Sequence, residues 1–308
     1  MFAYFAIPAG WDDLDRGYNA ANRHRRRFKR IVGGRAAFYP FVVRIESSLW
    51  KVASNWRCTG VLVTDQTVLT AAHCLLDVDG VLMRPDDIEV VGGALVERSA
   101  TEQRLAVSAL EVHEGYAETD CSVGYPYRHD VAIVRLRRPV RCRQRRFSTA
   151  PLPLKWISTR FDTFAAYEAR SHFRECRVIG WGSQAPGSYE LSFSPVMLEA
   201  RVSLLSGRDC LARRRRGRSC PPSPCSVCAA ALPFYNRDSC HGDSGGPLMC
   251  LREGTAADWR LVGLVSYGRS CARPFYPTFY ADVGCHLPWI LRTVGGGSAL
   301  YEAASRCV

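Results

Sequence analysis

Short apolar runs separated by polar turns form the main pattern in the first half of this chain. They cover residues 41–43, 61–63, 88–91, 105–112 and 131–136. Such runs are typical of strands, and their spacing favours an antiparallel barrel over alternating strands and helices. A second set of runs starts near residue 177 and extends through residue 268. The pattern therefore predicts an all-β chain.

Cysteine content indicates the compartment in which the chain resides. The 308 residues include 14 Cys. The cysteines are scattered instead of grouped like metal ligands, which indicates disulfides and an oxidising compartment. The chain also has no apolar window long enough to span a membrane. We therefore expect a secreted, extracellular monomer with no membrane span.

The formal net charge of +12 comes almost wholly from arginine, because lysine occurs only at Lys29, Lys51 and Lys155. A basic surface can attract polyanions such as sulfated glycans or nucleic acid. Ordinary solvated arginines account for the same composition, so both interpretations stay open. The cluster from Arg213 to Arg218 predicts either a polyanion-binding surface or an exposed loop that proteases nick.

The N-terminal residues do not identify a leader. Residues 1–10 are apolar and aromatic, but they lack the basic start and the long apolar core of a signal peptide. Secretion is therefore inferred without a recognised leader. The strongly basic run from His24 to Arg30 is typical of a solvated linker.

A serine between small residues is the first candidate for chemistry. Ser244 follows Gly242 and Asp243 and precedes two further glycines. Glycines let the backbone turn sharply and point its amides at a ligand, as a nucleophile site requires. The same residue types favour an ordinary turn, so this stretch alone leaves both interpretations open.

Two further stretches favour the catalytic interpretation. His73 follows an apolar run, and Asp130 stands at the head of the run 131–136. A hydroxyl nucleophile needs an imidazole to take its proton and a carboxylate to hold the imidazole tautomer. The order His73, Asp130, Ser244, with the residues around each, resembles the chymotrypsin and trypsin family of serine endopeptidases from residue 31 to about residue 294.

The resemblance implies a fold and a division of the chain. The fold would be two six-stranded antiparallel β-barrels with the three residues in the cleft between them, closed by a C-terminal helix that starts near Leu287. Residues 1–30 would be a leader and activation propeptide, residues 31–295 the protease domain and residues 296–308 a tail. The chemistry would be acyl transfer by Ser244, with no metal and no cofactor.

The resemblance also implies roles around the nucleophile. The backbone N–H groups of Gly242 and Ser244 would form the oxyanion hole. Cleavage between Arg30 and Ile31 would free an amine that pairs with Asp243, because a buried charge without a partner is strongly unfavourable. The basic run before this bond resembles sites cut by proprotein convertases, so such an enzyme or another trypsin-like protease would activate the chain.

Four residues would line the specificity pocket. Asp238 matches the acid at the base of the trypsin pocket, Ser266 supports Asp130 and Gly268 leaves the pocket mouth open. Thr278 stands where trypsin-like enzymes usually have glycine, and its branched side chain would narrow the pocket. The expected function is a zymogen-activated endopeptidase that cuts protein substrates after Arg or Lys. The alternatives are the same enzyme cutting after small or uncharged residues, and a weakly catalytic protease-like protein that binds polyanions.

Eight cysteines would form the disulfides that the resemblance implies. The pairs are Cys58 with Cys74, Cys176 with Cys250, Cys210 with Cys228 and Cys240 with Cys271. The pairing of the others stays open; they are Cys121, Cys142, Cys220, Cys225, Cys285 and Cys307.

The remaining stretches modify this picture. The aromatic-rich stretch 119–128 lengthens the loop before Asp130 and would border the substrate groove. Calcium dependence is not expected, because the segment 93–102 is short and has Ala94 where the family has a ligating acid. Five histidines lack the flanking sequence of His73 and are interpreted as surface or structural residues: His113, His129, His172, His241 and His286.

Overall fold

The computed structural model describes the greater part of the chain, with gaps. The described residues are 34–47, 49, 57–118, 127–140, 147–150, 173–183, 193–214, 223, 225–231, 239–268 and 277–296. Several residues of interest therefore lie outside the described residues, namely Arg30, Ile31 and Asp238. Among the described residues, no helix combines the length and apolar character needed to cross a membrane.

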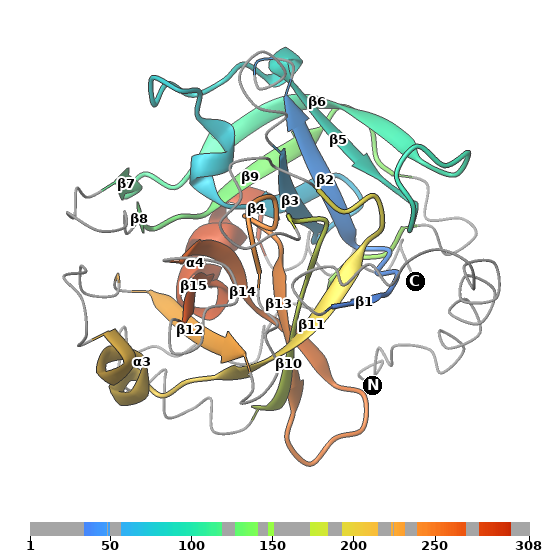
Figure 1. The fold of residues 1–308 in the computed structure, drawn as a ribbon. Coiled ribbons are helices and arrows are strands. Elements are labelled where there is room, and N and C mark those ends of the chain that lie inside the picture. The colour runs from blue at the N-terminus through green and yellow to red at the C-terminus, as the bar shows by residue number, and fades with distance from the viewer. Residues whose placement is uncertain are drawn as a thin grey trace.

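The first half of the described chain forms a closed antiparallel barrel with the strand order β2-β3-β4-β9-β6-β5 (Figure 1). Its strands are β2 (Val42–Ser47), β3 (Arg57–Leu62), β4 (Thr67–Thr70), β5 (Ile88–Gly92), β6 (Gln103–Val112) and β9 (Ala132–Leu136). Strand β4 is buried along its whole length. Its apolar residues belong to a core cluster that extends from the barrel interior to residues of the second half such as Trp181 and Leu261.

The second half closes in the same way, because β11 pairs with both β10 and β12. Its strands are β10 (Phe173–Gly180), β11 (Leu198–Leu204), β12 (Ser226–Ala231), β13 (Pro247–Arg252), β14 (Trp259–Gly268) and β15 (Thr278–Asp282). Strand β1 (Arg35–Ala36) adds to β11, and a short ribbon of β7 (Ala117–Glu118) and β8 (Tyr127–Arg128) precedes β9. The two six-stranded barrels confirm the fold class expected from the sequence.

Helix α4 (Val283–Val294) packs its buried face into the core that includes the first barrel. The Asp282 side chain accepts a hydrogen bond from Gly284 N–H, a favoured N-cap arrangement. Gly295, with φ of 97°, ends the helix in the left-handed conformation that glycine adopts readily. The helix thus begins before Leu287, where the sequence suggested its start. The cap was missed because Asp282 is also the last residue of β15.

Helix α3 (Gly207–Arg214) contains the start of the arginine cluster of the sequence. Arg213 and Arg214 are its last two residues, so the cluster begins within a helix and not in a loop. Residues 215–218 lie outside the described residues.

Each disulfide whose two cysteines are described joins segments within the same half of the chain. Three bridges have the pairing that the family resemblance implies: Cys58–Cys74, Cys176–Cys250 and Cys210–Cys228. A further bridge, Cys225–Cys285, links the segment before β12 to α4 and joins two cysteines whose pairing the sequence left open. Cys240 is also in a disulfide. Five cysteines lie outside the described residues: Cys121, Cys142, Cys220, Cys271 and Cys307.

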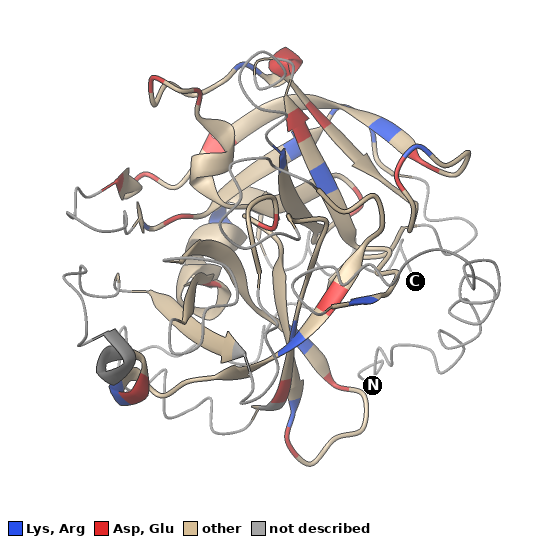
Figure 2. Cartoon of the chain, in the orientation of Figure 1, with Lys and Arg blue, Asp and Glu red and all other residues tan. Residues whose placement is uncertain are grey.

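A buried carboxylate is neutralised where β1, β11 and β10 lie side by side, and Figure 2 shows basic and acidic segments together there. Glu199 accepts hydrogen bonds from Arg35, Tyr39 and Arg177, the last at 3.1 Å. Burial acts to raise the pKa of the Glu199 carboxyl. The charge of Arg177 and the hydrogen bonds outweigh burial and hold this pKa below its ordinary value.

We predict that Glu199→Gln lowers stability at neutral pH by about 2 kcal/mol, because it removes the buried counter-charge shared by Arg35 and Arg177 and leaves Arg177 only its ion pair with Glu175 among the described residues. The pKa of Glu199 in the folded state lies below its unfolded-state value of about 4.3. The contribution of the Glu199 carboxylate to stability is therefore complete above a pH of about 4.3 and is lost as the pH falls through the folded-state pKa. Urea unfolding of Ser244→Ala protein between neutral and acid pH measures the effect. In Glu199→Gln the free energy of unfolding should fall less steeply at acid pH than in the parent protein. An equally steep fall in both proteins would contradict the account.

Candidate active site

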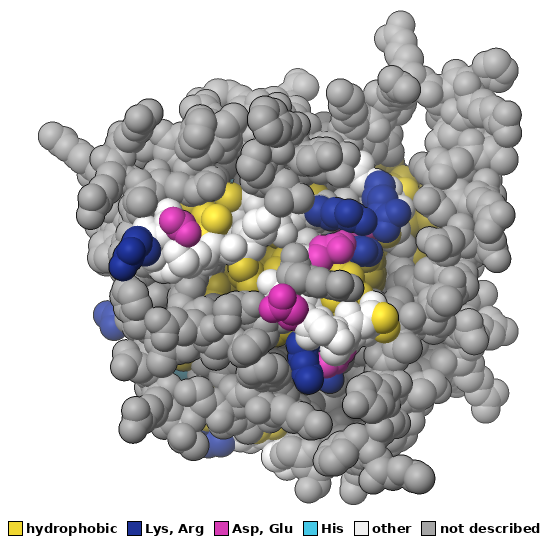
Figure 3. All heavy atoms as spheres, turned by 90° about the horizontal axis from the view of Figure 1, so that it is seen from below, with side chains coloured by type: hydrophobic (Ala, Val, Ile, Leu, Met, Phe, Trp, Pro, Cys, Tyr) yellow, Lys and Arg dark blue, Asp and Glu magenta, His cyan; other side chains and the backbone are white. Residues whose placement is uncertain are grey.

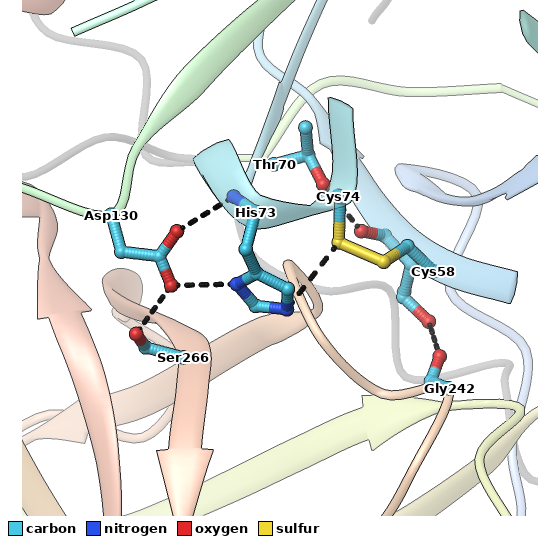
Figure 4. Close-up of a disulfide and its surroundings, with 8 residues drawn as sticks. Cys58, Thr70, His73, Cys74, Asp130, Gly242 and Ser266 are labelled. Carbon is cyan, nitrogen blue, oxygen red and sulfur yellow. Dashed lines mark hydrogen bonds and ion pairs between the residues drawn. A yellow bond between two sulfur atoms is a disulfide. The ribbon is translucent and has the colours of Figure 1, made fainter. Parts of the chain in front are cut away.

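The pairing of two strands brings His73 and Asp130 together. In the register of β4 with β9, Thr70 lies opposite Ala132. His73 lies three residues beyond Thr70, in a short 3-10 turn, and Asp130 lies two residues before Ala132. Both side chains therefore emerge at the same end of the strand pair, and Asp130 Oδ2 lies 2.8 Å from His73 Nδ1 (Figure 4).

Asp130 is buried and fully engaged. Its Oδ1 accepts a hydrogen bond from His73 N–H at 3.0 Å, and its Oδ2 accepts another from the Ser266 hydroxyl (Figure 4). Burial acts to raise the pKa of this carboxyl, but His73 and the hydrogen bonds outweigh burial and hold the pKa below its ordinary value. Because an ionised carboxylate can only accept hydrogen bonds, His73 carries its proton on Nδ1 and donates it in a hydrogen bond to Asp130. This leaves the lone pair of His73 Nε2 free to take a proton.

Ser244 lies in the tight turn 239–246 before β13, and its neighbour Gly242 has φ of +94°. A Cβ at Gly242 would come within 2.6 Å of the Phe193 ring, so both conformation and space require glycine. The carbonyl of His241 accepts from Ser183 N–H at 2.6 Å. Because a trans peptide points its C=O and N–H in opposite directions, Gly242 N–H faces away from Ser183.

The amides of Gly242 and Ser244 are available to a ligand. Among the described residues, neither N–H donates a hydrogen bond. Two unengaged N–H groups beside a candidate nucleophile are what stabilisation of an oxyanion requires.

Within the described part of the chain, no hydrogen bond joins Ser244 Oγ to His73 Nε2. The Nε2 atom instead lies 3.9 Å from Cys74 Sγ. Such a contact often tightens only when substrate binds, so its absence does not exclude Ser244 as the nucleophile.

Thr59 on β3 connects the Ser244 turn to the first barrel, and Figure 4 shows Thr70 and Gly242 on either side of this connection. Thr59 Oγ1 donates to the carbonyl of Gly242 at 2.8 Å, and Thr59 N–H donates to the carbonyl of Ser244 at 2.8 Å. Thr70 Oγ1 donates to the Thr59 carbonyl at 2.9 Å. The backbone on both sides of Asp243 is thus held by Thr59 on β3, whose own carbonyl is held by Thr70 on β4. The sequence analysis did not identify Thr59, and no local pattern marks it.

Asp243 is fully buried and oriented by the backbone. Its Oδ1 accepts from Gly182 N–H at 2.8 Å and its Oδ2 accepts from Cys240 N–H at 2.9 Å. A Cβ on Gly182 would lie 2.3 Å from Oδ2, so glycine is required for this close approach. Ile31, the expected partner of Asp243, lies outside the described residues.

Thr278, the residue expected to narrow the specificity pocket, is the first residue of β15. It is buried, and its Oγ1 lies 3.4 Å from the donating hydroxyl of Ser239. A Cβ added to Gly268 would approach this same Oγ1 to 3.3 Å. Thr278 and Gly268 are partners in the register of β15 with β14, so they lie directly beside each other. Asp238, the expected pocket base, precedes Ser239 and lies outside the described residues.

Tyr127 is a contact of His73 that the sequence analysis did not assign individually. Its ring stacks on the His73 imidazole with a centroid distance of 4.8 Å and an interplanar angle of 15°. It also meets Tyr267 edge-on at 6.3 Å. The aromatic content of the stretch 119–128 was the available signal in the sequence.

Among the described residues, two groups of side chains have the composition of metal ligands. Cys58, Cys74 and His73 form the first, but the two sulfurs are joined in a disulfide and offer no thiolate. Three histidines away from Ser244 form the second group: His113, His129 and His286.

Comparisons with known proteins agree with this geometry. The family model described as Trypsin matches residues 31–290. The chain is 33% identical over 268 residues to coagulation factor XII of Sus scrofa, covering 85% of this chain and 39% of that protein. It is 32% identical over 276 residues to coagulation factor XII of Rattus norvegicus, covering 87% and 42%. The chain thus spans about two fifths of the length of these relatives.

One solved structure shows the same fold. It is neuropsin, a serine protease expressed in the limbic system of mouse brain, with a TM-score of 0.63 and 24% sequence identity. The match covers 85% of this chain and 98% of that one. At this identity the likeness supports the fold alone.

We predict that Thr59→Val lowers kcat for a peptide substrate by about two- to tenfold with little change in KM. The variant keeps the side-chain shape but removes the hydrogen bond to the Gly242 carbonyl, worth about 0.5–1.5 kcal/mol. Thr67→Val, at the first residue of the neighbouring strand β4 and also buried, is the matched control for stability. Equal kcat values in the two variants would show that Thr59 does not position the Ser244 turn.

Proposed function

Because the chain belongs to the trypsin family, we propose that it is a serine endopeptidase in which His73, Asp130 and Ser244 act together. The observation that carries this proposal is the buried Asp130 carboxylate, which fixes His73 through Nδ1 and leaves the lone pair on Nε2 to take a proton. The unengaged amides of Gly242 and Ser244 support the same assignment.

The proposed reaction is acyl transfer in two steps. Ser244 Oγ attacks the carbonyl carbon of the scissile peptide while His73 Nε2 takes the hydroxyl proton. The N–H groups of Gly242 and Ser244 stabilise the oxyanion, and His73 returns the proton to the departing amine. Water then repeats the sequence on the acyl-enzyme, with His73 again as base. Asp130 stays ionised and stabilises the imidazolium in both steps.

Activation is proposed to follow cleavage between Arg30 and Ile31. The new amine of Ile31 would pair with Asp243, whose carboxylate is already oriented by the amides of Gly182 and Cys240. A buried ion pair of this kind stabilises the turn that carries Ser244. Residues 1–30 would then be the propeptide, residues 31–295 the protease domain and residues 296–308 a tail.

Specificity is proposed to favour Arg or Lys before the scissile bond, because a carboxylate at Asp238 needs a cation. Thr278 supports the second candidate, which is cleavage after small or uncharged residues. Its buried side chain, close to Ser239 and Gly268, reduces the space through which a long basic side chain would pass.

The setting is proposed to be extracellular, with protein substrates and a separate activating protease. The disulfides and the factor XII relatives support secretion. Polyanion binding by Arg213 to Arg218 is a weaker proposal. Figure 3 shows one face of the molecule, on which basic and acidic side chains of the described residues lie beside one another. The side chains of Arg213 to Arg218 are not among the described ones, so this proposal rests on their sequence alone.

A peptide-library cleavage profile tests the proposal. The Arg30-cleaved protein should cut after Arg or Lys, because Asp238 stabilises a basic side chain in the pocket, and Ser244→Ala should give no cleavage. Thr278→Gly should raise kcat/KM for Arg and Lys peptides by about tenfold or more, since it removes the branched side chain that obstructs the pocket.

Three outcomes separate the candidates. Cleavage only after small residues, converted to basic specificity by Thr278→Gly, would establish the second candidate. Cleavage after small residues in both proteins would show that Asp238 does not govern the pocket. No cleavage above the Ser244→Ala blank, from correctly cleaved and folded protein, would contradict the peptidase function.

A further inference from the structure

Three histidines from distant parts of the sequence meet where α4 packs against the first barrel. His113 directly follows β6, His129 lies between β8 and β9, and His286 lies on α4. One ring nitrogen from each lies within 4.8 Å of the other two. His286 is buried, and the other two are partly exposed, so the cluster has one buried and two accessible members.

The three rings of the cluster are in mutual contact. His113 and His129 stack with a centroid distance of 4.6 Å. His286 presents its edge to both, at 5.4 Å from each. His129 Nδ1 lies 3.2 Å from His286 Nε2. Two imidazole nitrogens bound tetrahedrally to one Zn²⁺ are separated by about 3.3 Å, which follows from Zn–N bonds of about 2.0–2.1 Å.

The tautomer of His286 is set by its surroundings. Its Nδ1 lies 2.7 Å from the carbonyl oxygen of Asp282, which can only accept, so Nδ1 carries the proton. The lone pair of His286 Nε2 is then directed at His129. A backbone carbonyl that holds the far nitrogen of an imidazole in this way is typical of metal-binding histidines.

We propose that His113, His129 and His286 form a binding site for a divalent transition ion of the Zn²⁺ class, separate from His73 and Ser244. Imidazole nitrogens suit such ions, and three histidines leave a fourth position for water. Binding requires His129 to carry its proton on Nε2 instead of Nδ1. It also requires the His113 ring to rotate and give up the hydrogen bond that its Nδ1 accepts from Gly115 N–H.

The bound ion would clamp α4 to the first barrel. Two ligands come from segments flanking the strands of that barrel, and the third comes from the helix that follows the second barrel. His129 is also the residue before Asp130, so the clamp would hold the segment that carries this carboxylate. Nothing in the flanking sequence of the three histidines indicates such a site, since each stands alone in its own segment.

The test measures Zn²⁺ binding directly, by competition with a chromophoric chelator, on full-length Ser244→Ala protein. We expect one ion per chain. Affinity should fall at least about tenfold in His113→Asn and in His129→Asn, because each loses a ligand nitrogen. Zn²⁺ should also raise Tm in the Ser244→Ala protein and fail to do so in either variant. The measurement does not depend on peptidase activity, so its failure is separate from failure of the proposed function.

Two controls address the other histidines. His73→Ala should leave the affinity unchanged, because His73 belongs to a different cluster, and so should His172→Asn. Thermal melts without metal check that each variant is folded. If His129→Asn fails to fold, His113→Asn still tests the site, because it alters a partly exposed side chain. Absence of binding at about 100 μM Zn²⁺ would overturn the proposal. Binding that is lost in His73→Ala and kept in His129→Asn would overturn it as well.

Discussion

The buried carboxylate of Asp130 is the constraint on which the candidate site depends. A charge without water is strongly unfavourable unless hydrogen bonds replace its solvation. Here the replacement comes from both halves of the molecule: His73 of the first barrel supplies two donors, and Ser266 on β14 of the second supplies another. The carboxylate therefore fixes the histidine and at the same time ties the two barrels at the site.

The Ser244 turn also depends on contacts from both barrels. It belongs to the second barrel, yet its backbone carbonyls are held by Thr59 on β3 of the first. A displacement of one barrel relative to the other would move the candidate oxyanion donors away from His73. The site thus has a defined geometry only when both barrels are packed, and the core shared between them provides that packing.

The sequence predicted the elements that depend on local pattern. Apolar runs located β5, β6 and β9, and the residues around His73, Asp130 and Ser244 carried a family resemblance strong enough to predict both barrels. The sequence could not reveal contacts between distant residues without a distinctive neighbourhood. Thr59 is an ordinary strand threonine, and Cys225–Cys285 was one of several possible pairings. His129 and His286 are 157 residues apart.

Labelling by an active-site phosphonate tests the central claim most directly, because the reagent reacts only with a serine activated by its surroundings. We predict that the Arg30-cleaved chain takes up one phosphonate, located on Ser244 by peptide mass analysis. His73→Ala should react far more slowly, and Ser244→Ala should not react. A folded and correctly cleaved chain that stays unlabelled, or a Ser244→Ala variant labelled to the same extent, would contradict the account.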